Sequence, residues 1–302
     1  AKLRVMSSAR TPLDVAVIGV GRMGRHHVRI YDKLPEARLV AVVDADEERV
    51  ETLADEYDCA AFTSVDAMLQ AHPQLAAATV ATPTAYHMQA ARPLIERRIA
   101  CLIEKPLAPS VQACHEIATL ARQHDAMLQV GHTERFNPAV RAVSEMGMTP
   151  RFIEVDRVSP MTFRSIDVGV VFDIMIHDLD IVLMMTGRPI TDIRAVGVSV
   201  LGEYEDVADA RIEFDTGCVA KITASRLALK TERKLRVFSE TGYVTLDYAS
   251  KTGLALTRTD NEEALNRVRR QIADGADLSD VDYMDLVNVR ELTINDEEPL
   301  RA

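Results

Sequence analysis

Residues 13–24 read LDVAVIGVGRMG, an apolar run that leads directly into three closely spaced glycines. The run Leu13–Ile18 is rich in apolar and β-branched residues, which is typical of a buried parallel strand. The segment that follows the glycines, His26–Tyr31, has helical spacing and contains no proline. Strand, Gly-x-Gly-x-x-Gly and helix in this order are the pattern of a turn that binds a dinucleotide.

Each glycine has a separate task in such a turn. Gly19 makes the tight turn, Gly21 lets the backbone approach a pyrophosphate, and Gly24 lets the helix pack on the strand. Arg22 and Met23 lie between Gly21 and Gly24, ahead of the predicted helix, and the phosphates would sit at the N-terminus of that helix, where backbone N–H groups and the helix dipole favour negative charge. We therefore expect these five residues to contact the cofactor.

An acidic residue after the next strand supports the same interpretation. The run Ala37–Val43 predicts a second strand, and Asp44 follows it about 20 residues after Gly24. A carboxylate at this position accepts hydrogen bonds from the adenosine ribose and repels a 2′-phosphate. The sequence thus favours NAD over NADP, with the alternative that Asp44 merely ends a strand.

Two further motifs follow apolar strands of the same region. Glu104-Lys105-Pro106 comes after the predicted strand Ala100–Ile103, and Thr82-Pro83 comes after the predicted strand Leu75–Ala81. Ligands bind at the carboxyl ends of parallel strands, so both motifs are expected to line one crevice with the glycine loop. An isolated Glu-Lys-Pro is usually a surface turn, and it becomes a candidate site here because of the glycines upstream.

The order of elements predicts two domains of different class. Strands and helices alternate as far as Gly131, which indicates an α/β domain with a doubly wound parallel sheet at residues 13–131. Beyond about residue 150, several strands joined by short turns surround one helix, Ile174–Met185. This pattern predicts an α+β domain at residues 132–302 with an open-faced, mostly antiparallel sheet.

Composition excludes several classes of protein. The chain has 302 residues and a formal charge of −11, which argues against a nucleic-acid partner. No apolar stretch has membrane-spanning length, and residues 1–12 lack the apolar core of a secretion signal. Cysteines 59, 101, 114 and 218 show no paired spacing, so reduced thiols are expected rather than disulfides or metal ligands. We expect a cytoplasmic enzyme without a metal or membrane partner.

A third motif makes the pattern specific. Residues 169–180 read GVVFDIMIHDLD, with Asp173 and His177 four residues apart and hence on one side of a helix. Together with the glycine loop and Glu-Lys-Pro, this segment resembles the Gfo/Idh/MocA oxidoreductase family. The resemblance implies an N-terminal Rossmann domain, a nicotinamide cofactor, and a site that faces it. The residues it assigns near the cofactor are Thr82, Pro83, His87, Glu104, Lys105, Asp173 and His177, with a structural role for His87 equally open.

The chemistry of alcohol oxidation explains these residue types. A histidine titrates near neutral pH and can take the hydroxyl proton, which makes His177 the expected general base. The Lys105 ammonium would stabilise the developing alkoxide, and Asp173 would orient the imidazole. Members of the family exchange the roles of lysine and histidine, so the division between these two stays open. His26 and His27 are predicted to be surface or packing residues.

The resemblance also suggests a substrate. The stretches GHTERFNPA (131–139) and RSIDVG (164–169) resemble the branch of the family that oxidises C3 of UDP-N-acetylglucosamine or its uronic acid, which feeds 3-amino-sugar synthesis for lipid A or surface polysaccharide. The resemblance of the run Arg164–Val171 favours the neutral sugar. A diphosphate requires arginine forks and amide donors, which Arg135, Asn137 and Arg164 would supply. Arg135 could instead pair with a carboxylate of the protein. Arg157 is left outside the predicted site.

Other functions remain open at this point. One is a dehydrogenase of a free polyol or monosaccharide such as inositol or glucose, and another is a non-catalytic NAD(P)-binding sensor or scaffold. The family resemblance implies a homodimer or homotetramer that forms through the C-terminal sheet. Family members commonly continue past a Glu-Pro-Leu segment, whereas Glu298-Pro299-Leu300 is followed here by Arg301 and Ala302 alone. A naturally short chain and an incomplete one are both compatible with this ending.

Overall fold

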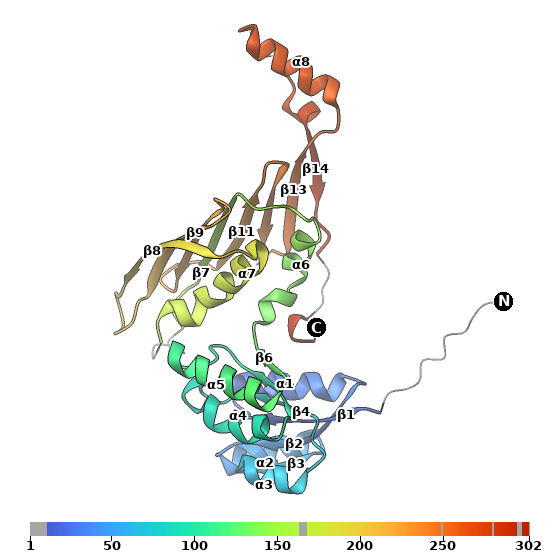
Figure 1. Cartoon of the computed structure of the whole chain (residues 1–302), viewed down its shortest axis with the longest axis vertical. Coiled ribbons are helices and arrows are strands. Elements are labelled where there is room, and N and C mark those ends of the chain that lie inside the picture. Colours follow the sequence, from blue (N-terminus) through green and yellow to red (C-terminus); the bar gives the residue numbers. More distant parts are fainter. Residues whose placement is uncertain (1–10, 163–167, 249, 280, 295–297, 302) are drawn as a thin grey trace, which may run out of the picture. The chain divides into compact units, whose positions relative to one another are not determined.

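The computed structural model describes residues 11–162, 168–248, 250–279, 281–294 and 298–301 (Figure 1). They form two compact units, one of which ends at His132 while the other begins at Thr133. Each unit has its own sheet and its own hydrophobic core.

Unit 1 is built on a six-stranded sheet in which every described pairing is parallel. The strand order is β3-β2-β1-β4-β5-β6, which is the order of a Rossmann fold, with the switch point between β1 and β4. The doubly wound prediction is therefore confirmed. The strands are β1 (Leu13–Ile18), β2 (Ala37–Val43), β3 (Ala60–Phe62), β4 (Ala77–Val80), β5 (Ala100–Ile103) and β6 (Leu128–Val130).

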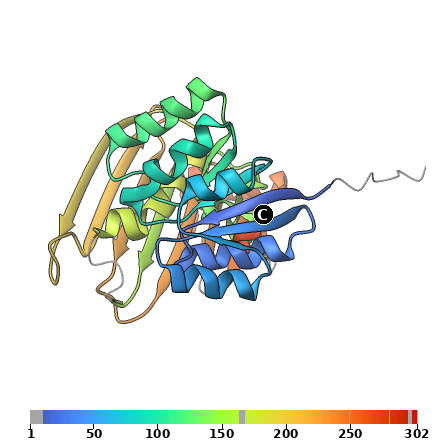
Figure 2. The same ribbon diagram turned by 90° about the horizontal axis from the view of Figure 1, so that it is seen from below.

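Helices cover both faces of this sheet (Figure 2). Alternate residues of β1 face opposite sides. Ala16 and Ile18 belong to the cluster that contains Leu94 of α4, and Val17 belongs to the cluster that contains Val28 of α1. The helices are α1 (Arg22–Lys33), α2 (Glu47–Glu56), α3 (Val65–Ala71), α4 (His87–Glu96) after the short turn η1 (Thr84–Tyr86), and α5 (Val111–His124).

Unit 2 is built on an eight-stranded sheet of order β14-β13-β12-β11-β7-β10-β9-β8. All described pairings are antiparallel except that of β7 with β10, which confirms a mostly antiparallel sheet. The strands are β7 (Phe152–Val158), β8 (Ile190–Val198), β9 (Val207–Phe214), β10 (Val219–Ser225), β11 (Glu232–Phe238), β12 (Gly242–Asp247), β13 (Thr252–Arg258) and β14 (Val287–Glu291).

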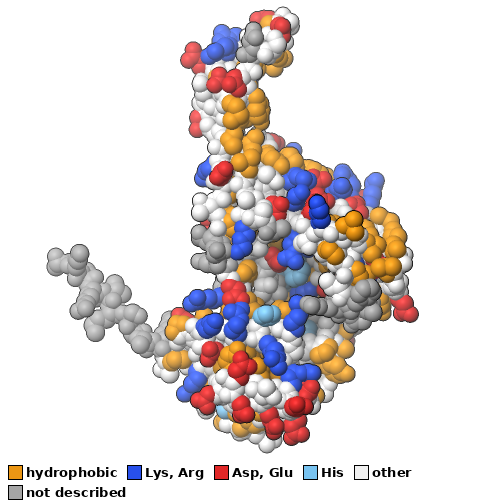
Figure 3. All heavy atoms as spheres, turned by 180° about the vertical axis from the view of Figure 1, so that it is seen from behind, with side chains coloured by type: hydrophobic (Ala, Val, Ile, Leu, Met, Phe, Trp, Pro, Cys, Tyr) orange, Lys and Arg blue, Asp and Glu red, His pale blue; other side chains and the backbone are white. Residues whose placement is uncertain are grey.

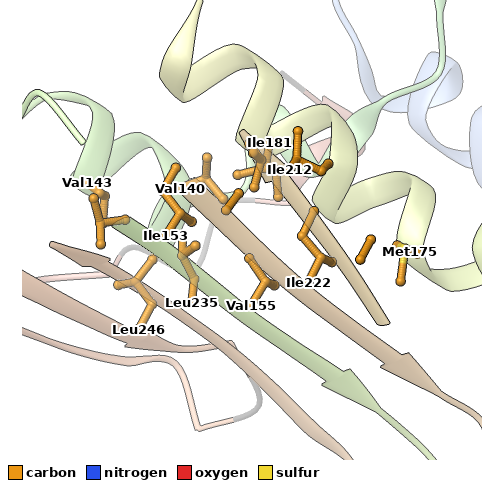
Figure 4. Packing of buried hydrophobic residues seen from close by; sticks show 14 of the residues in the cluster. Val140, Val143, Ile153, Val155, Met175, Ile181, Ile212, Ile222, Leu235 and Leu246 are labelled. Atoms are coloured by element: carbon orange, nitrogen blue, oxygen red, sulfur yellow. The ribbon is translucent and has the colours of Figure 1, made fainter. Parts of the chain in front are cut away.

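One face of this sheet is packed against helices. Figure 4 shows Val140, Met175 and Ile181 directed at residues of the sheet, among them Ile153 and Ile222. These side chains come from α6 (Pro138–Ser144), the π-helical turn η3 (Val171–Met175) and α7 (Ile176–Thr186). The buried rows of β7, β10 and β11 alternate with exposed or half-buried positions, as a sheet with one covered face requires.

The edge strand β8 differs from its neighbours because nearly all of its residues are exposed. Val196 is 61% exposed and Val198 is 50% exposed. Such apolar exposure is typical of a surface that another chain covers. Assembly of a dimer or tetramer through this sheet stays a prediction.

One predicted boundary was wrong in unit 2. The first two residues of the helix expected at Ile174–Met185 belong to η3, and α7 begins at Ile176. Strands β13 and β14 and helix α6 were not predicted. Between β13 and β14 the chain forms α8 (Glu262–Ala273) and the turn η4 (Tyr283–Leu286), and Figure 1 shows α8 beyond the ends of these two strands.

The face drawn in Figure 3 carries charged side chains of both signs. Acidic and basic side chains are mixed over this face. Within the described residues, no helix combines the length and the apolarity that crossing a bilayer would need.

Candidate active site

Two of the three glycines are required by the fold of unit 1 itself. Gly19 has a φ of 84°, and a Cβ on it would lie 2.5 Å from the backbone nitrogen of Thr82. A Cβ on Gly24 would overlap the carbonyl oxygen of Gly19. Both positions therefore exclude a side chain for reasons internal to the chain.

Gly21 is different, because an added Cβ would meet nothing within 4 Å. It precedes α1, whose start has no side-chain cap and no acidic residue in its first turn. Arg22 and Met23 are the first residues of this helix. The open space beside Gly21 and the uncompensated positive end of α1 fit a pyrophosphate.

The two kinds of glycine are expected to respond differently to alanine. Gly21→Ala should weaken NAD binding by about tenfold or more and leave the melting temperature unchanged, since its backbone angles suit alanine and its surroundings are open. Gly24→Ala should cost about 1–3 kcal/mol of folding stability through overpacking. Calorimetric titration with NAD and thermal unfolding of both variants would measure this. Equal loss of stability in the two variants would contradict the assignment.

Asp44 joins the end of β2 to the glycine loop. Its Oδ2 accepts a hydrogen bond of 2.8 Å from the Val20 N–H, and its Oδ1 accepts one of 3.1 Å from the Asp46 N–H. Arg49 lies 3.5 Å from the same Oδ1. A carboxylate has about four acceptor positions, so these contacts leave capacity for ribose hydroxyls. Contact of Asp44 with the ribose stays a prediction.

Thr82 and Pro83 follow β4 at the same edge of the sheet as Gly19. The Thr82 hydroxyl is buried and has no hydrogen-bond partner within the described residues. An orphaned buried hydroxyl beside the glycine loop fits a site that a ligand completes. His87, which is 1% exposed, places Nε2 2.9 Å from the Thr82 carbonyl oxygen and Nδ1 3.1 Å from the Leu107 carbonyl oxygen. His87 thus ties this loop to the segment after Glu-Lys-Pro, and its contact with the cofactor stays a prediction.

Glu104 and Lys105 follow β5, the next strand in the sheet. The Glu104 N–H donates 2.9 Å to Val80 and the Ala81 N–H donates 2.7 Å to Ile18, so the ladder continues to the ends of β1, β4 and β5. The structure therefore brings Gly19, Thr82 and Glu104 to one edge of the sheet, as predicted. Glu104 itself is only 6% exposed, and the peptide bond between Lys105 and Pro106 is cis.

In unit 2, Asp173 and His177 lie where η3 passes into α7. The Ile176 N–H donates to the Val171 carbonyl five residues back, which marks a π-helical turn. Asp173 belongs to this turn and His177 to the regular helix that follows. The two residues share one continuous helical segment, although not the uniform α-helix that the spacing predicted.

The loop between β8 and β9 holds the start of this segment. The Val170 N–H donates 2.9 Å to the Glu205 carbonyl oxygen, and the Val171 N–H donates 3.2 Å to the Glu205 carboxylate. A Cβ on Gly169 would overlap that carboxylate. The glycine is therefore needed for Glu205 to reach the first turn, two residues before Asp173.

The polar residues expected to bind substrate have partners in the protein. Arg135 forms a fork on Asp180, with Nε and Nη2 at 2.6 and 2.5 Å from the two carboxylate oxygens. Asn137 caps α6 by accepting from the Ala139 N–H at 3.0 Å, and its amide donates 3.1 Å to Glu134. The alternative of an Arg135–carboxylate pair is thus observed. Arg164 lies outside the described residues.

Arg157, which sequence reasoning left outside the site, lies close to it. It occupies the buried row of β7 with Ile153 and Val155, and its guanidinium donates 2.7 and 2.8 Å to Asp178, the residue after His177. Burial disfavours a charged guanidinium, but the Asp178 carboxylate outweighs this and raises the pKa of Arg157 above its usual value.

Two arginine forks therefore hold the first turns of α7. Asp178 and Asp180 are two residues apart, which places them on roughly opposite sides of a helix. Arg157 on β7 binds the first, and Arg135 on the turn η2 (Thr133–Phe136) binds the second. A signal was present in the sequence, because acidic residues within an apolar helix need partners.

Two of the cysteines are not activated as nucleophiles. Burial raises the pKa of Cys59 to about 11 and that of Cys101 to about 12, which keeps these thiols protonated at neutral pH. No group of three or more His, Cys, Asp or Glu suited to a metal ion occurs in the part of the chain that the structure describes.

Unit 1 thus has the strand order, glycine loop, open helix start and orphaned hydroxyl of an NAD-binding Rossmann domain. A lysine at the end of β5 and an aspartate–histidine helix in unit 2 are group types that oxidation of a CH–OH group uses. These features define an NAD-dependent dehydrogenase.

Comparison with known proteins agrees. The family model described as an oxidoreductase family with an NAD-binding Rossmann fold matches residues 13–132, and the GFO/IDH/MocA C-terminal domain model matches residues 150–245. The chain belongs to the Gfo/Idh/MocA oxidoreductase family, which has an NAD-binding Rossmann fold and includes dehydrogenases of CH–OH groups.

Three relatives illustrate the range of similarity. UDP-N-acetylglucosamine 3-dehydrogenase of Acidithiobacillus ferrooxidans is 35% identical over 241 residues, 80% of this chain and 75% of that protein. A crystal structure of that enzyme has a TM-score of 0.83 and 30% identity, over 96% of this chain and 86% of the other. Myo-inositol dehydrogenase Hyg17 of Streptomyces leeuwenhoekii is 32% identical over 230 residues, 71% of this chain and 70% of that protein. GenD2 from gentamicin A biosynthesis, solved in complex with NAD, has a TM-score of 0.74 and 25% identity over 84% of this chain and 77% of the other.

Proposed function

We propose that this dehydrogenase oxidises the C3 hydroxyl of a UDP-N-acetylhexosamine, with UDP-N-acetylglucosamine as the preferred sugar. The observation that carries the proposal is the similarity to UDP-N-acetylglucosamine 3-dehydrogenase, which spans 80% of the sequence and 96% of the structure. The inositol dehydrogenase relative matches a smaller part of the chain at lower identity.

In this proposal Gly21, Asp44 and Thr82 hold the cofactor and Lys105 and His177 act on the alcohol. NAD, when bound, supplies the acceptor for the hydride that leaves the carbon. The His177 imidazole takes the proton of the hydroxyl, and the Lys105 ammonium stabilises the oxygen while it carries negative charge. Asp173 orients the imidazole. The product is a ketone, with the carbon oxidised and the proton held on the protein.

The roles of lysine and histidine could be exchanged without changing the reaction. A neutral Lys105 would then take the proton, and a protonated His177 would donate a hydrogen bond to the oxygen. The shape of the pH–rate profile of a His177→Asn variant would distinguish the two arrangements, because loss of the base removes the limb for its ionisation.

The nucleotide diphosphate would be recognised by cationic side chains of unit 2. Asp180 occupies the Nε and Nη2 side of Arg135. We propose that a phosphate binds the remaining Nη1 side, and that Arg164 supplies a second cation. Both ends of the Asn137 side chain already have partners, so a contact of Asn137 with the substrate would replace its hydrogen bond to Glu134.

Purified protein with NAD and UDP-N-acetylglucosamine is expected to form NADH, while inositol and glucose under the same conditions should give none. The measurement is the appearance of nicotinamide absorbance, with identification of a keto sugar by mass spectrometry. UDP-glucose is the matched control for the acetamido group. Turnover with a free polyol alone would replace the substrate proposal, and tight NAD binding without any turnover would favour a sensor.

A further inference from the structure

A buried polar contact joins the helix of the glycine loop to the Glu-Lys-Pro motif. His27 on α1 places Nε2 2.7 Å from Oε1 of Glu104, across 77 residues of chain. His27 is 3% exposed and Glu104 is 6% exposed. His27 was predicted to be a surface or packing residue, and the structure gives it a polar partner that the sequence pattern did not indicate.

The second oxygen of the same carboxylate reaches the lysine backbone. Glu104 Oε2 accepts a hydrogen bond of 3.2 Å from the Lys105 N–H. On another side, an ideal Cβ on Gly131 would lie 3.0 Å from this oxygen, so the glycine after β6 permits the carboxylate to sit there. The carboxylate therefore has two partners, His27 on α1 and the N–H of the residue that follows it, and Gly131 after β6 leaves room for it.

Burial of a carboxylate costs folding free energy, which its hydrogen-bond partners offset only in part. A carboxylate loses its hydration when it is buried, and apolar residues of similar size often give equal or greater stability. Another contact already ties α1 to the sheet, since the Tyr31 hydroxyl lies 2.7 Å from Thr79 Oγ1 on β4. Attachment of α1 alone does not explain why the chain places a histidine and a glutamate together beside Lys105.

We propose that His27 and Glu104 are positioning residues for Lys105: His27 holds the Glu104 carboxylate, and the carboxylate fixes the Lys105 peptide. The direction in which the Lys105 side chain leaves the end of β5 then depends on α1, the helix whose first turn follows the cofactor loop. This inference rests on the proposed function, in which Lys105 acts on the substrate oxygen.

Two substitutions on α1 separate positioning from stability. His27→Leu removes the contact with Glu104, and Tyr31→Phe removes a partly buried side-chain hydrogen bond one turn further along the same helix. Both should lower the melting temperature, His27→Leu by more, because it leaves the buried Glu104 carboxylate without its partner. His27→Leu should also reduce kcat by about 10–100-fold with little change in KM, whereas Tyr31→Phe should keep the kcat of the parent protein.

Two further variants test the hydrogen bonds themselves. His27→Gln keeps a donor for Glu104 and should recover most of kcat. Glu104→Leu removes both acceptor oxygens, the one for His27 and the one for the Lys105 N–H, so it should behave like His27→Leu in kcat. Equal kcat values for His27→Leu and Tyr31→Phe would overturn the inference.

A second readout does not depend on the substrate. An amine-reactive reagent labels Lys105 at a rate that reports the environment of its Nζ. This rate is measured by mass spectrometry in the NADH-bound protein as a function of pH. The profile is expected to change in His27→Leu and Glu104→Leu and to stay unchanged in Tyr31→Phe. If the profile changes in this way but UDP-N-acetylglucosamine is not oxidised, the positioning role stands and the proposed substrate fails. An unchanged profile in all variants contradicts the positioning role.

Discussion

Replacement of Lys105 by alanine is expected to reduce kcat by about 10²–10⁴-fold, the usual contribution of a positioned acid–base or charge-stabilising group. The alkoxide that forms as the hydride leaves would lack its nearest cation. NAD should still bind, because Gly21, Asp44 and Thr82 are unchanged. Steady-state rates with the nucleotide sugar and NADH fluorescence titrations would measure the two effects separately.

Two controls give this result its meaning. Lys105→Arg keeps a positive charge but cannot give up its proton, so it should retain part of kcat if the lysine stabilises charge and none if the lysine is the base. Lys33→Ala removes an exposed lysine at the end of α1 and should leave kcat unchanged. A Lys105→Ala variant with the kcat of the parent protein would remove Lys105 from the site.

Replacement of Arg157 by alanine is expected to destabilise unit 2 by about 3–5 kcal/mol, which corresponds to a fall of roughly 6–20 °C in melting temperature. The Asp178 side chain is 1% exposed and the Arg157 side chain 7% exposed, so the variant would leave a buried carboxylate without its fork. Thermal unfolding followed by circular dichroism would measure the change.

The matched double variant tests whether the stability of unit 2 depends on the ion pair itself or on the volume that the two side chains fill. Arg157→Met combined with Asp178→Leu removes both charges and should recover most of the lost stability, as replacement of buried ion pairs by apolar residues often does. Arg194→Ala breaks an exposed ion pair in which the Arg194 side chain is 78% exposed and the Asp192 side chain 44% exposed. It should change the free energy of unfolding by less than about 1 kcal/mol. If Arg157→Ala unfolds no more easily than Arg194→Ala, the fork does not hold α7.

The class of each domain could be predicted from local patterns. Gly19 and Gly24 mark a turn whose geometry excludes side chains, and β1, the strand that leads into it, is a short apolar run. Ser64 and Ser110 accept hydrogen bonds from the backbone three residues later, as expected of helix caps. The Gly24–Gly19 contact and the serine caps depend on neighbours within five residues, which is why spacing was sufficient to find them, whereas the close approach of Thr82 to Gly19 comes from the packing of β4 beside β1.

The strands near one edge of the unit 2 sheet, β13 and β14, have a weaker signal in the sequence. β14 is exposed along most of its length, so it lacks the alternation that identifies a strand with one buried face. β13 is paired on both sides, yet only Ala255 is buried among its residues. α6 is short and begins at a proline, so a helical period is hard to recognise in it. Their conformations come from sheet pairing and packing rather than from local preference.

The candidate site shows the same division. The glycine loop, Glu104-Lys105 and the Asp173–His177 spacing were visible in the order of residues along the chain, because each motif is contiguous. The partners of the charged side chains were not visible, since they come from distant segments: 77 residues separate His27 from Glu104, 45 separate Arg135 from Asp180, and 21 separate Arg157 from Asp178. A buried charge is stable only beside a partner, and which partner it meets depends on how the elements pack.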